Sequence, residues 1–186
     1  MTDPTSPTGR YRKKPNFDNP TNFLGKVPPQ AIELEEAVLG ALMLEKDALT
    51  SVIDILKVES FYKESHKVIF QAILDLFTES MPIDLLTVTT QLRKNGALEV
   101  AGGAFYITEL TSKVASAANI EFHARIITEQ SIKRELIRMS SEVMKEAFDD
   151  TNDVFDVLNK AEGDLFKIAE NNMGKAVDVM QNVVRE

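Results

Sequence analysis

The chain has 186 residues, of which 44% are hydrophobic and 27% charged, enough for one folded domain with extensions. The net charge is −8, and the absence of cysteine excludes a disulfide scaffold, a cysteine-ligated zinc site and a thiol nucleophile, while two histidines are too few for a three-histidine metal site within one chain. No apolar run reaches the ~18 residues of a membrane span and the N-terminus has no apolar signal segment, so we expect a cytoplasmic protein that spans no membrane.

Residues 1–26 form a basic leader. Six of the seven prolines lie between positions 4 and 29, and residues 1–29 carry a net charge of +3, which leaves −11 on the rest of the chain. A segment with so few apolar residues buries too little surface to fold, so we expect it to be disordered. Its basic cluster Arg10–Lys14 is either solvated or a contact for nucleic acid.

Residues 27–115 are predicted to form a compact helical head of about five to six helices. Apolar residues recur at helical spacing, and Pro, Asp and Gly stand at the expected starts and stops. The five helices that we place begin after Pro28-Pro29 and then run over about 47–56, 64–78, 84–95 and 104–113.

Three residues of the head have specific predicted roles. Gly40, inside the first helix, is expected to allow close contact with another helix. Asp84 is the expected N-cap of its helix, which ends at the left-handed stop signal Asn95-Gly96. His66 is expected to be a partly buried, hydrogen-bonded side chain and not a catalytic one.

A helical extension is predicted over residues 116–148. Its apolar positions change phase around the polar segment 128–131. That change indicates either a bend that makes a helical hairpin or the exposed face of one long helix, because no Gly or Pro forces a break.

An acidic loop and an amphipathic helix, over about 153–170, are predicted within residues 149–186. The apolar residues of this helix are spaced 4, 3, 4 and 3 apart, and two phenylalanines flank them. Such a stripe needs a cover, which is the head, a neighbouring subunit or a domain outside the chain. The stripe with its flanking residues comprises Val154, Phe155, Leu158, Ala161, Leu165, Phe166 and Ile168.

Motifs for catalysis are missing or weak. Neither Gly-Lys pair has the remaining residues of a phosphate-binding loop, so we expect no ATP hydrolysis by this chain alone. No Glu lies three residues before either histidine, as helical di-iron sites require. The run Asp149-Asp150-Thr151-Asn152-Asp153 matches a Mg²⁺-diphosphate pattern of isoprenoid enzymes, but a solvated loop between helices is the favoured interpretation.

Several motifs, in order, resemble those of the DnaB-type family of bacterial replicative DNA helicases. The similarity covers about residues 27–172. It rests on Val27–Leu44, Phe61-Tyr62 with His66 and Ile69-Phe70, Pro82–Leu85, Gly102-Gly103 with Tyr106 and Leu110, Ser116–Ile120, and Leu165–Glu170.

The resemblance implies the collar of a ring-shaped hexamer that unwinds DNA with ATP and recruits primase. It implies that the helix over about 153–170 is a linker helix, which docks through its stripe on the motor domain of a neighbouring subunit. It also implies that the extension 116–148 joins subunits in pairs within the hexamer. The candidate pairing residues are Ile126, Ile127, Leu136, Val143 and Phe148.

The same resemblance places the RecA-like motor domain outside this chain. We therefore assign no catalytic, cofactor-binding or metal-binding residue here and expect ATP, Mg²⁺ and DNA to bind the motor. A helical adaptor that binds helicase or primase in trans is the alternative function. An enzyme with Mg²⁺ at Asp149, Asp150 and Asp153 is a third.

Overall fold

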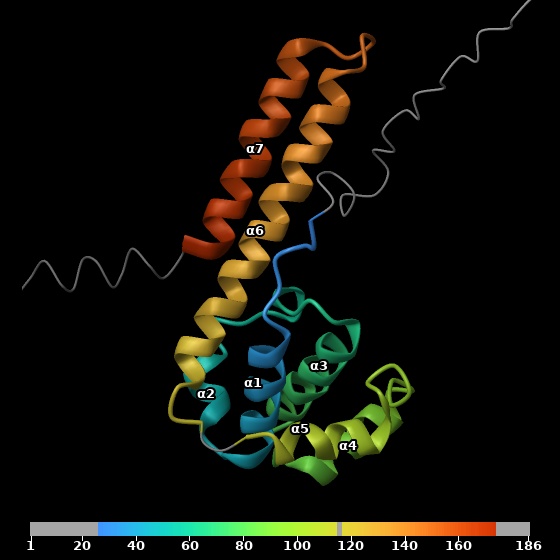
Figure 1. Ribbon diagram of the computed structural model, residues 1–186, viewed down its shortest axis with the longest axis vertical. Helices are drawn as coiled ribbons and strands as arrows, with labels where there is room; N and C mark the ends of the chain where they lie inside the picture. The colour runs from blue at the N-terminus through green and yellow to red at the C-terminus, as the bar shows by residue number, and fades with distance from the viewer. Residues whose placement is uncertain (1–25, 115–116, 174–186) are drawn as a thin grey trace, which may run out of the picture.

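The computed structural model describes residues 26–114 and 117–173, and in these ranges it is all-helical (Figure 1). This confirms the predicted all-α class. The basic leader up to residue 25 and the segment 174–186 lie outside the described residues. The elements are α1 (Ile32–Leu44), α2 (Ala48–Val52), the 3-10 helix η2 (Val58–Ser60), α3 (Glu64–Thr78), α4 (Leu85–Lys94), α5 (Gly103–Ser112), α6 (Ile120–Ala147) and α7 (Val154–Met173).

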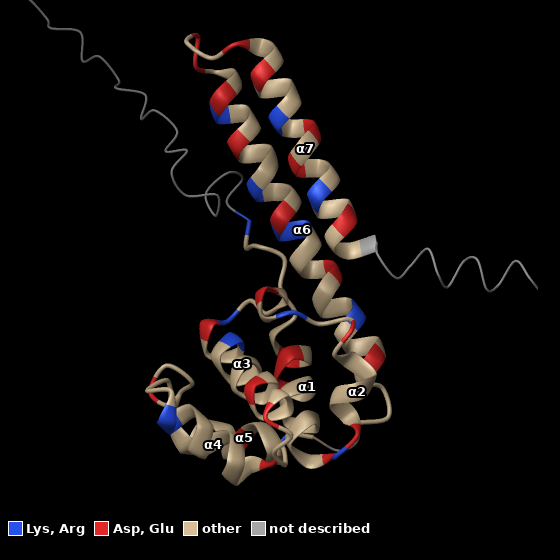
Figure 2. Ribbon diagram, turned by 180° about the vertical axis from the view of Figure 1, so that it is seen from behind, with Lys and Arg blue, Asp and Glu red and all other residues tan. Residues whose placement is uncertain are grey.

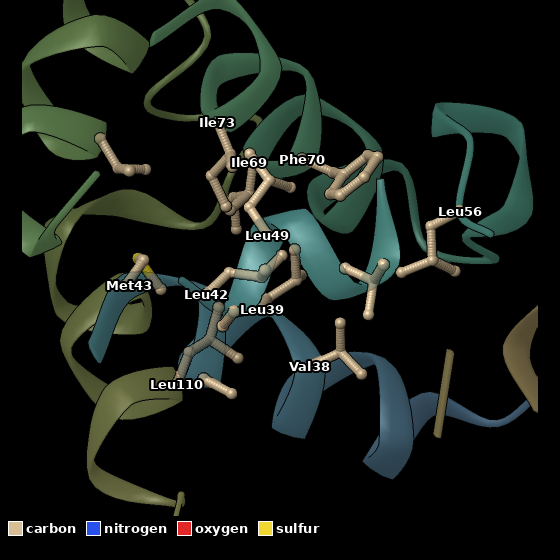
Figure 3. Close-up of a cluster of buried hydrophobic side chains, with 14 of the residues drawn as sticks. Val38, Leu39, Leu42, Met43, Leu49, Leu56, Ile69, Phe70, Ile73 and Leu110 are labelled. Carbon is tan, nitrogen blue, oxygen red and sulfur yellow. The ribbon is translucent and has the colours of Figure 1, made fainter. Parts of the chain in front are cut away.

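Helices α1 to α5 form the head, and α1 lies at its centre. Helix α1 contacts α3, α5 and α6, and its residues from Val38 to Met43 are all buried. Figure 3 shows Val38, Leu39 and Leu42 of α1 among the buried apolar side chains of the neighbouring helices. A helix that is buried on most sides needs apolar residues all round, as the run Ala41-Leu42-Met43 provides.

Local signals account for both ends of α4. Asp84 accepts hydrogen bonds from the backbone N–H groups of Leu86 and Thr87, which confirms it as the N-cap of α4. Gly96 has a φ of +68°, the left-handed conformation that ends helices and that glycine adopts without strain. Helix α3 has the predicted ends.

The second helix is shorter than predicted. The prediction ran from about Asp47 to Leu56, but α2 ends at Val52 and the chain turns. The residues at Leu49, Val52 and Leu56 are nevertheless buried, so their helical spacing reports burial and not a continuous helix. The 3-10 helix η2 that follows was not predicted.

The extension is one continuous helix, which decides between the two interpretations that the sequence left open. Helix α6 has 28 residues and is roughly 42 Å long at ~1.5 Å per residue. Its first half packs against α1, α2 and η2, and its second half projects from the head beside α7 (Figure 1). The hairpin of this protein is therefore formed by α6 and α7, not within 116–148.

No helix within the described ranges combines the length and the apolar character that crossing a membrane requires.

Candidate protein interaction site: the α6–α7 hairpin

The base of the hairpin is attached to the head by side chains of the polar segment of α6. The hydroxyl of Thr128 donates to the Ile55 carbonyl at 3.1 Å, and that of Ser131 donates to the Glu59 carbonyl at 3.3 Å. The two hydroxyls thus satisfy backbone carbonyls in the turn after α2 and in η2. This explains why a polar stretch interrupts the apolar pattern of α6.

Arg134, which lies about one helical turn beyond Ser131, adds two more hydrogen bonds to the head. Its guanidinium donates to the Pro29 carbonyl at 2.9 Å and to the Ser60 carbonyl at 2.7 Å. Burial lowers the pKa of Arg134, and the nearby carboxylate of Glu35 opposes this effect. One side chain thus joins α6 to the segment before α1 and to η2.

Helices α6 and α7 are the two arms of the hairpin, and the loop between them is held by its own polar residues. The Asp149 carboxylate accepts hydrogen bonds from the hydroxyl and the backbone N–H of Thr151, and these bonds lower its pKa. Asp153 accepts from the backbone N–H of Phe155 at the start of α7. Two of the acidic residues that match the Mg²⁺-diphosphate pattern are therefore turn and cap residues.

No group of three acidic or histidine side chains suited to a metal ion is present in the described part of the chain.

Helix α7 packs along α6, so α6 covers part of the apolar stripe of α7. The predicted covers were the head, a neighbouring subunit or a domain outside the chain, and α6 was not among them. Lys160 of α7 forms an ion pair with Glu146 of α6, and this pair raises the pKa of Lys160. A groove of about 620 Å³ runs between α6 and α7. On the α7 side it is lined by Leu158, Ala161 and Leu165 of the predicted stripe.

The remaining stripe residues differ in exposure. Val154, Phe155 and Phe166 are exposed by 69%, 69% and 66%, whereas Ile168 is half-buried. Phe155 and Phe166 are 11 residues apart, which is close to three full turns, so they lie on one face of α7. This face leaves two large aromatic side chains in solvent.

The five candidate pairing residues of the extension do not form one surface. Ile127 is 1% exposed and belongs to the core of the head, where it holds α6 in place. Ile126 and Leu136 are half-buried, Val143 lines the groove between the arms, and Phe148 is 74% exposed beside the loop.

Sequence reasoning missed the methionines of the groove. Met139 and Met144 line it from α6, beside Val143 and Ala147. The spacing of Leu136, Met139 and Val143 gave the signal, since residues three and four apart share a helix face.

A second polar cluster lies inside the head, around His66. The ring of His66 is fully buried, with Nδ1 2.6 Å from Glu35 Oε2 and Nε2 2.7 Å from the hydroxyl of Tyr106. Both ring nitrogens thus have partners from α1 and α5, which confirms a hydrogen-bonded histidine that is more deeply buried than predicted. Glu35 and Tyr106 were not identified as its partners from the sequence.

Glu36 continues this cluster toward the surface. It contacts the Tyr106 hydroxyl at 3.2 Å and the ammonium groups of Lys63 and Lys113 at 3.3 and 3.0 Å. Burial alone raises the pKa of Glu36, but the hydrogen bonds from Lys113, Lys63 and Tyr106 outweigh it and lower the pKa. Burial and the Glu36 charge raise the pKa of Tyr106. The cluster ties α1, α3 and α5 together.

Residues 27–129 match the family described as the DnaB-like helicase N terminal domain. Over 179 residues the chain is 45% identical to the replicative DNA helicase DnaB of Rhodothermus marinus, covering 96% of this chain and 19% of that protein. It is 38% identical over 159 residues to the replicative DNA helicase DnaC of Bacillus subtilis, covering 86% of this chain and 35% of that protein. The chain thus spans at most about a third of these two relatives.

Two solved structures share the fold. The crystal structure of the N-terminal domain of the DnaB helicase from Mycobacterium tuberculosis matches with a TM-score of 0.72 and 34% identity, over 76% of this chain and 99% of that one. The structure of a DnaB-like replicative helicase, described with its interactions with primase, matches with a TM-score of 0.64 over 83% of this chain and 36% of that one. The identity to the second is 21%, so it supports the fold alone.

Proposed function

The chain belongs to the family of the DnaB-like helicase N-terminal domain, and from this premise we propose that it is the assembly and docking module of a replicative DNA helicase. Its role is to associate with further copies, as pairs within a hexameric collar, and to dock primase. Unwinding of DNA, with the ATP and Mg²⁺ that it needs, belongs to a motor domain. The cell compartment of such a module is the cytoplasm.

The observation that carries this proposal is the exposed apolar surface of the hairpin. Phe148, Val154, Phe155 and Phe166 are each more than half exposed on a hairpin that projects away from the head (Figure 1). Large apolar side chains clustered on a projecting element are typical of protein interaction sites. A partner that covers them gains roughly 1.5–3 kcal/mol for each fully buried side chain.

The proposal assigns different surfaces to different contacts. The face of α7 with Phe155 and Phe166 is the docking face for the motor domain of a neighbouring subunit, as proposed for a linker helix. The loop end with Phe148, together with the half-buried Ile126 and Leu136, is the pairing surface of α6. Ile127 is left out of this surface because it is buried in the head.

Primase is proposed as a partner because the chain belongs to the DnaB-like helicase N-terminal domain family, of which the resemblance implies primase recruitment, and a DnaB-like replicative helicase has been described with its interactions with primase. The position of the primase contact is not part of the proposal.

The experiment that tests the proposal is sedimentation velocity of the 186-residue chain over a range of concentrations. We expect self-association, and we expect Phe148→Asp, on the proposed pairing surface, to raise the dissociation constant by about 10- to 100-fold, the equivalent of losing one buried aromatic side chain. The matched control is Asn159→Asp, which adds the same charge to α7 at an exposed position without removing apolar surface.

A chain that stays monomeric at every concentration would contradict the assembly role. So would equal dissociation constants for Phe148→Asp and the unchanged chain, provided that circular dichroism shows both to be folded.

A further inference from the structure

The C-terminal end of α7 returns to the head. Helix α7 has 20 residues and is roughly 30 Å long, whereas α6 extends only roughly 20 Å from Arg134 to Ala147. The two helices run antiparallel, so the last turns of α7 come back alongside the part of α6 that is attached to the head (Figure 1). Ile168 and Asn172 are half-buried at this end, whereas Val154 at the other end is 69% exposed.

The last turn of α7 contains no basic residue. Residues 170–173 are Glu, Asn, Asn and Met, so the turn carries one negative charge. The last four carbonyl groups of a helix have no partner inside it, and they form the negative end of the helix dipole, where a cation is stabilising. The side chain of Asn172 donates to the Ile168 carbonyl at 2.7 Å, which lies before these four. The end of α7 is therefore favourable for a positively charged donor from another element.

Lys57 of the head is such a donor. Its ammonium group donates to the carbonyl oxygen of Asn171 at 3.0 Å, although the two residues are 114 positions apart. Asn171 is one of the last four residues of α7, so its carbonyl has no partner within the helix. Figure 2 shows acidic residues on both arms of the hairpin, and their charge adds to the attraction of a lysine.

Lys57 extends from a segment that is itself attached to α6. Its backbone N–H donates to the Ser60 hydroxyl at 3.0 Å, and Arg134 donates to the Ser60 carbonyl at 2.7 Å. Ser131 donates to the neighbouring Glu59 carbonyl at 3.3 Å. Residues 57–60 thus bind α6 through backbone carbonyls and α7 through one lysine side chain, so the same short segment holds both arms.

We propose that Lys57 is a latch, a positioning residue that anchors the C-terminal end of α7 to the head. The ion pair between Lys160 and Glu146 holds α7 nearer the loop, so the two lysines fasten α7 at two separate places. With the latch closed, α7 does not pivot about the loop, and residue 173 stays beside the head. The latch thereby fixes the point at which the chain leaves the hairpin.

The test measures the distance between spin labels at Ser51, in α2, and Lys167, on α7, in the 186-residue chain. Both residues are exposed and the chain has no cysteine, so Ser51→Cys and Lys167→Cys give two attachment points. The labelled chain is diluted with unlabelled chain, so that only distances within one chain are measured and association between copies does not affect the result. We expect a single narrow distance distribution.

Three further substitutions in the labelled chain test the lysine itself. Lys57→Met removes the charge but keeps most of the apolar stem, and it should broaden the distribution toward longer distances. Lys57→Arg keeps the positive charge and a comparable reach, and it should keep the distribution narrow. Lys46→Met, at an exposed lysine of the turn between α1 and α2, is the matched control and should leave the distribution unchanged.

Hydrogen exchange of the unlabelled chain provides a second measurement. We expect the amides of residues 168–173 to exchange about two- to fivefold faster after Lys57→Met, because one favourable charge at a helix end is lost. The amides of α3 should exchange at the rate of the parent chain.

The proposal is wrong if Lys57→Met and Lys46→Met give the same distance distribution. It is also wrong if Lys57→Arg broadens the distribution as much as Lys57→Met, since the positive charge would then have no part in holding α7. Equal acceleration of exchange in α3 and at the end of α7 would assign Lys57 to the general stability of the head and would equally rule out a latch.

Discussion

Gly40 is the residue whose size matters most for how α1 and α5 pack. A Cβ atom added there would lie 2.2 Å from the backbone carbonyl oxygen of Leu110 and 2.5 Å from a methyl group of Val114. The first of these contacts involves backbone, which cannot rotate away as a side chain does. The structure confirms the close helix contact that the sequence predicted at this glycine.

We therefore expect Gly40→Ala to lower the free energy of unfolding by about 1–3 kcal/mol, in the range measured for overpacked cores. Gly163→Ala is the matched control, since an added Cβ on α7 meets nothing within 4 Å. That change should leave stability equal or raise it by up to about 1 kcal/mol through helix propensity. Urea unfolding of both variants measures the difference, and equal stabilities would contradict the packing argument.

Glu36 is the residue whose charge gives the head a dependence on pH. Its pKa in the folded protein is below the ordinary value of 4.5 because Lys113, Lys63 and Tyr106 donate hydrogen bonds to it. A carboxyl with a lowered pKa stabilises the fold above its unfolded pKa, and this contribution is lost as pH falls through the folded pKa.

We expect Glu36→Gln to destabilise the protein at pH 7 and to have a smaller effect below pH 4, where the carboxyl is becoming protonated in the parent chain as well. Urea unfolding at both pH values provides the measurement. Glu33→Gln, at an exposed position of the same helix, is the control and should show little change at either pH. A pH-independent effect of Glu36→Gln would show that its charge is not responsible.

Helix α6 combines two different environments in one element. Its buried residues, Ile120, Ala124, Ile127 and Ser131, all lie in the first half, where the helix completes the core of the head. Beyond Arg134, the second half packs against α7. The polar residues at the boundary donate to backbone carbonyls of the head, so they fix the direction in which the hairpin leaves it.

Arg134 is the side chain of α6 on which this direction depends most. We expect Arg134→Met to lower the free energy of unfolding by roughly 1.5–3 kcal/mol, because two backbone carbonyls lose a charged donor. Arg138→Met is the matched control one turn further on. It removes only an exposed ion pair with Glu142 and should cost less than about 0.5 kcal/mol. Similar losses for the two variants would mean that Arg134 contributes no more than a surface charge.

At the scale of the whole molecule, burial is uneven between head and hairpin. Helices α1 and α3 supply ten of the 24 buried apolar core residues in the described ranges, whereas none of residues 154–172 is buried. Regions with few buried contacts open at low free energy, so the hairpin should open without unfolding of the head.

This predicts a gradient in amide hydrogen exchange at concentrations where the chain is monomeric. We expect slow exchange in α1, α3 and the first half of α6, and faster exchange from Leu136 onward and throughout α7. Exchange measured by mass spectrometry on peptides gives the comparison. Protection of α7 equal to that of α3 would refute the separation, while protection that rises with concentration would support association through the hairpin.

The sequence by itself determined the all-α class, the ends of α3, the cap at Asp84 and the glycine stop at Gly96, because these depend on interactions within a few residues. It also supported membership of the helicase family, since ordered motifs survive divergence better than any single site. Periodicity identified the apolar stripe of α7 and the need for a cover.

Only the tertiary structure decided what covers it. Leu158, Ala161 and Leu165 line the groove beside α6 of the same chain, but Leu158 and Leu165 are still more than half exposed, as are Phe155 and Phe166, because the packing of two helices alone covers only part of a stripe. The same holds for Ile127, whose apolar character predicts burial but not whether its own chain or another provides it. Contacts between residues far apart in sequence, such as Arg134 with Pro29 or His66 with Tyr106, have no local signature, so the three-dimensional packing alone determined them.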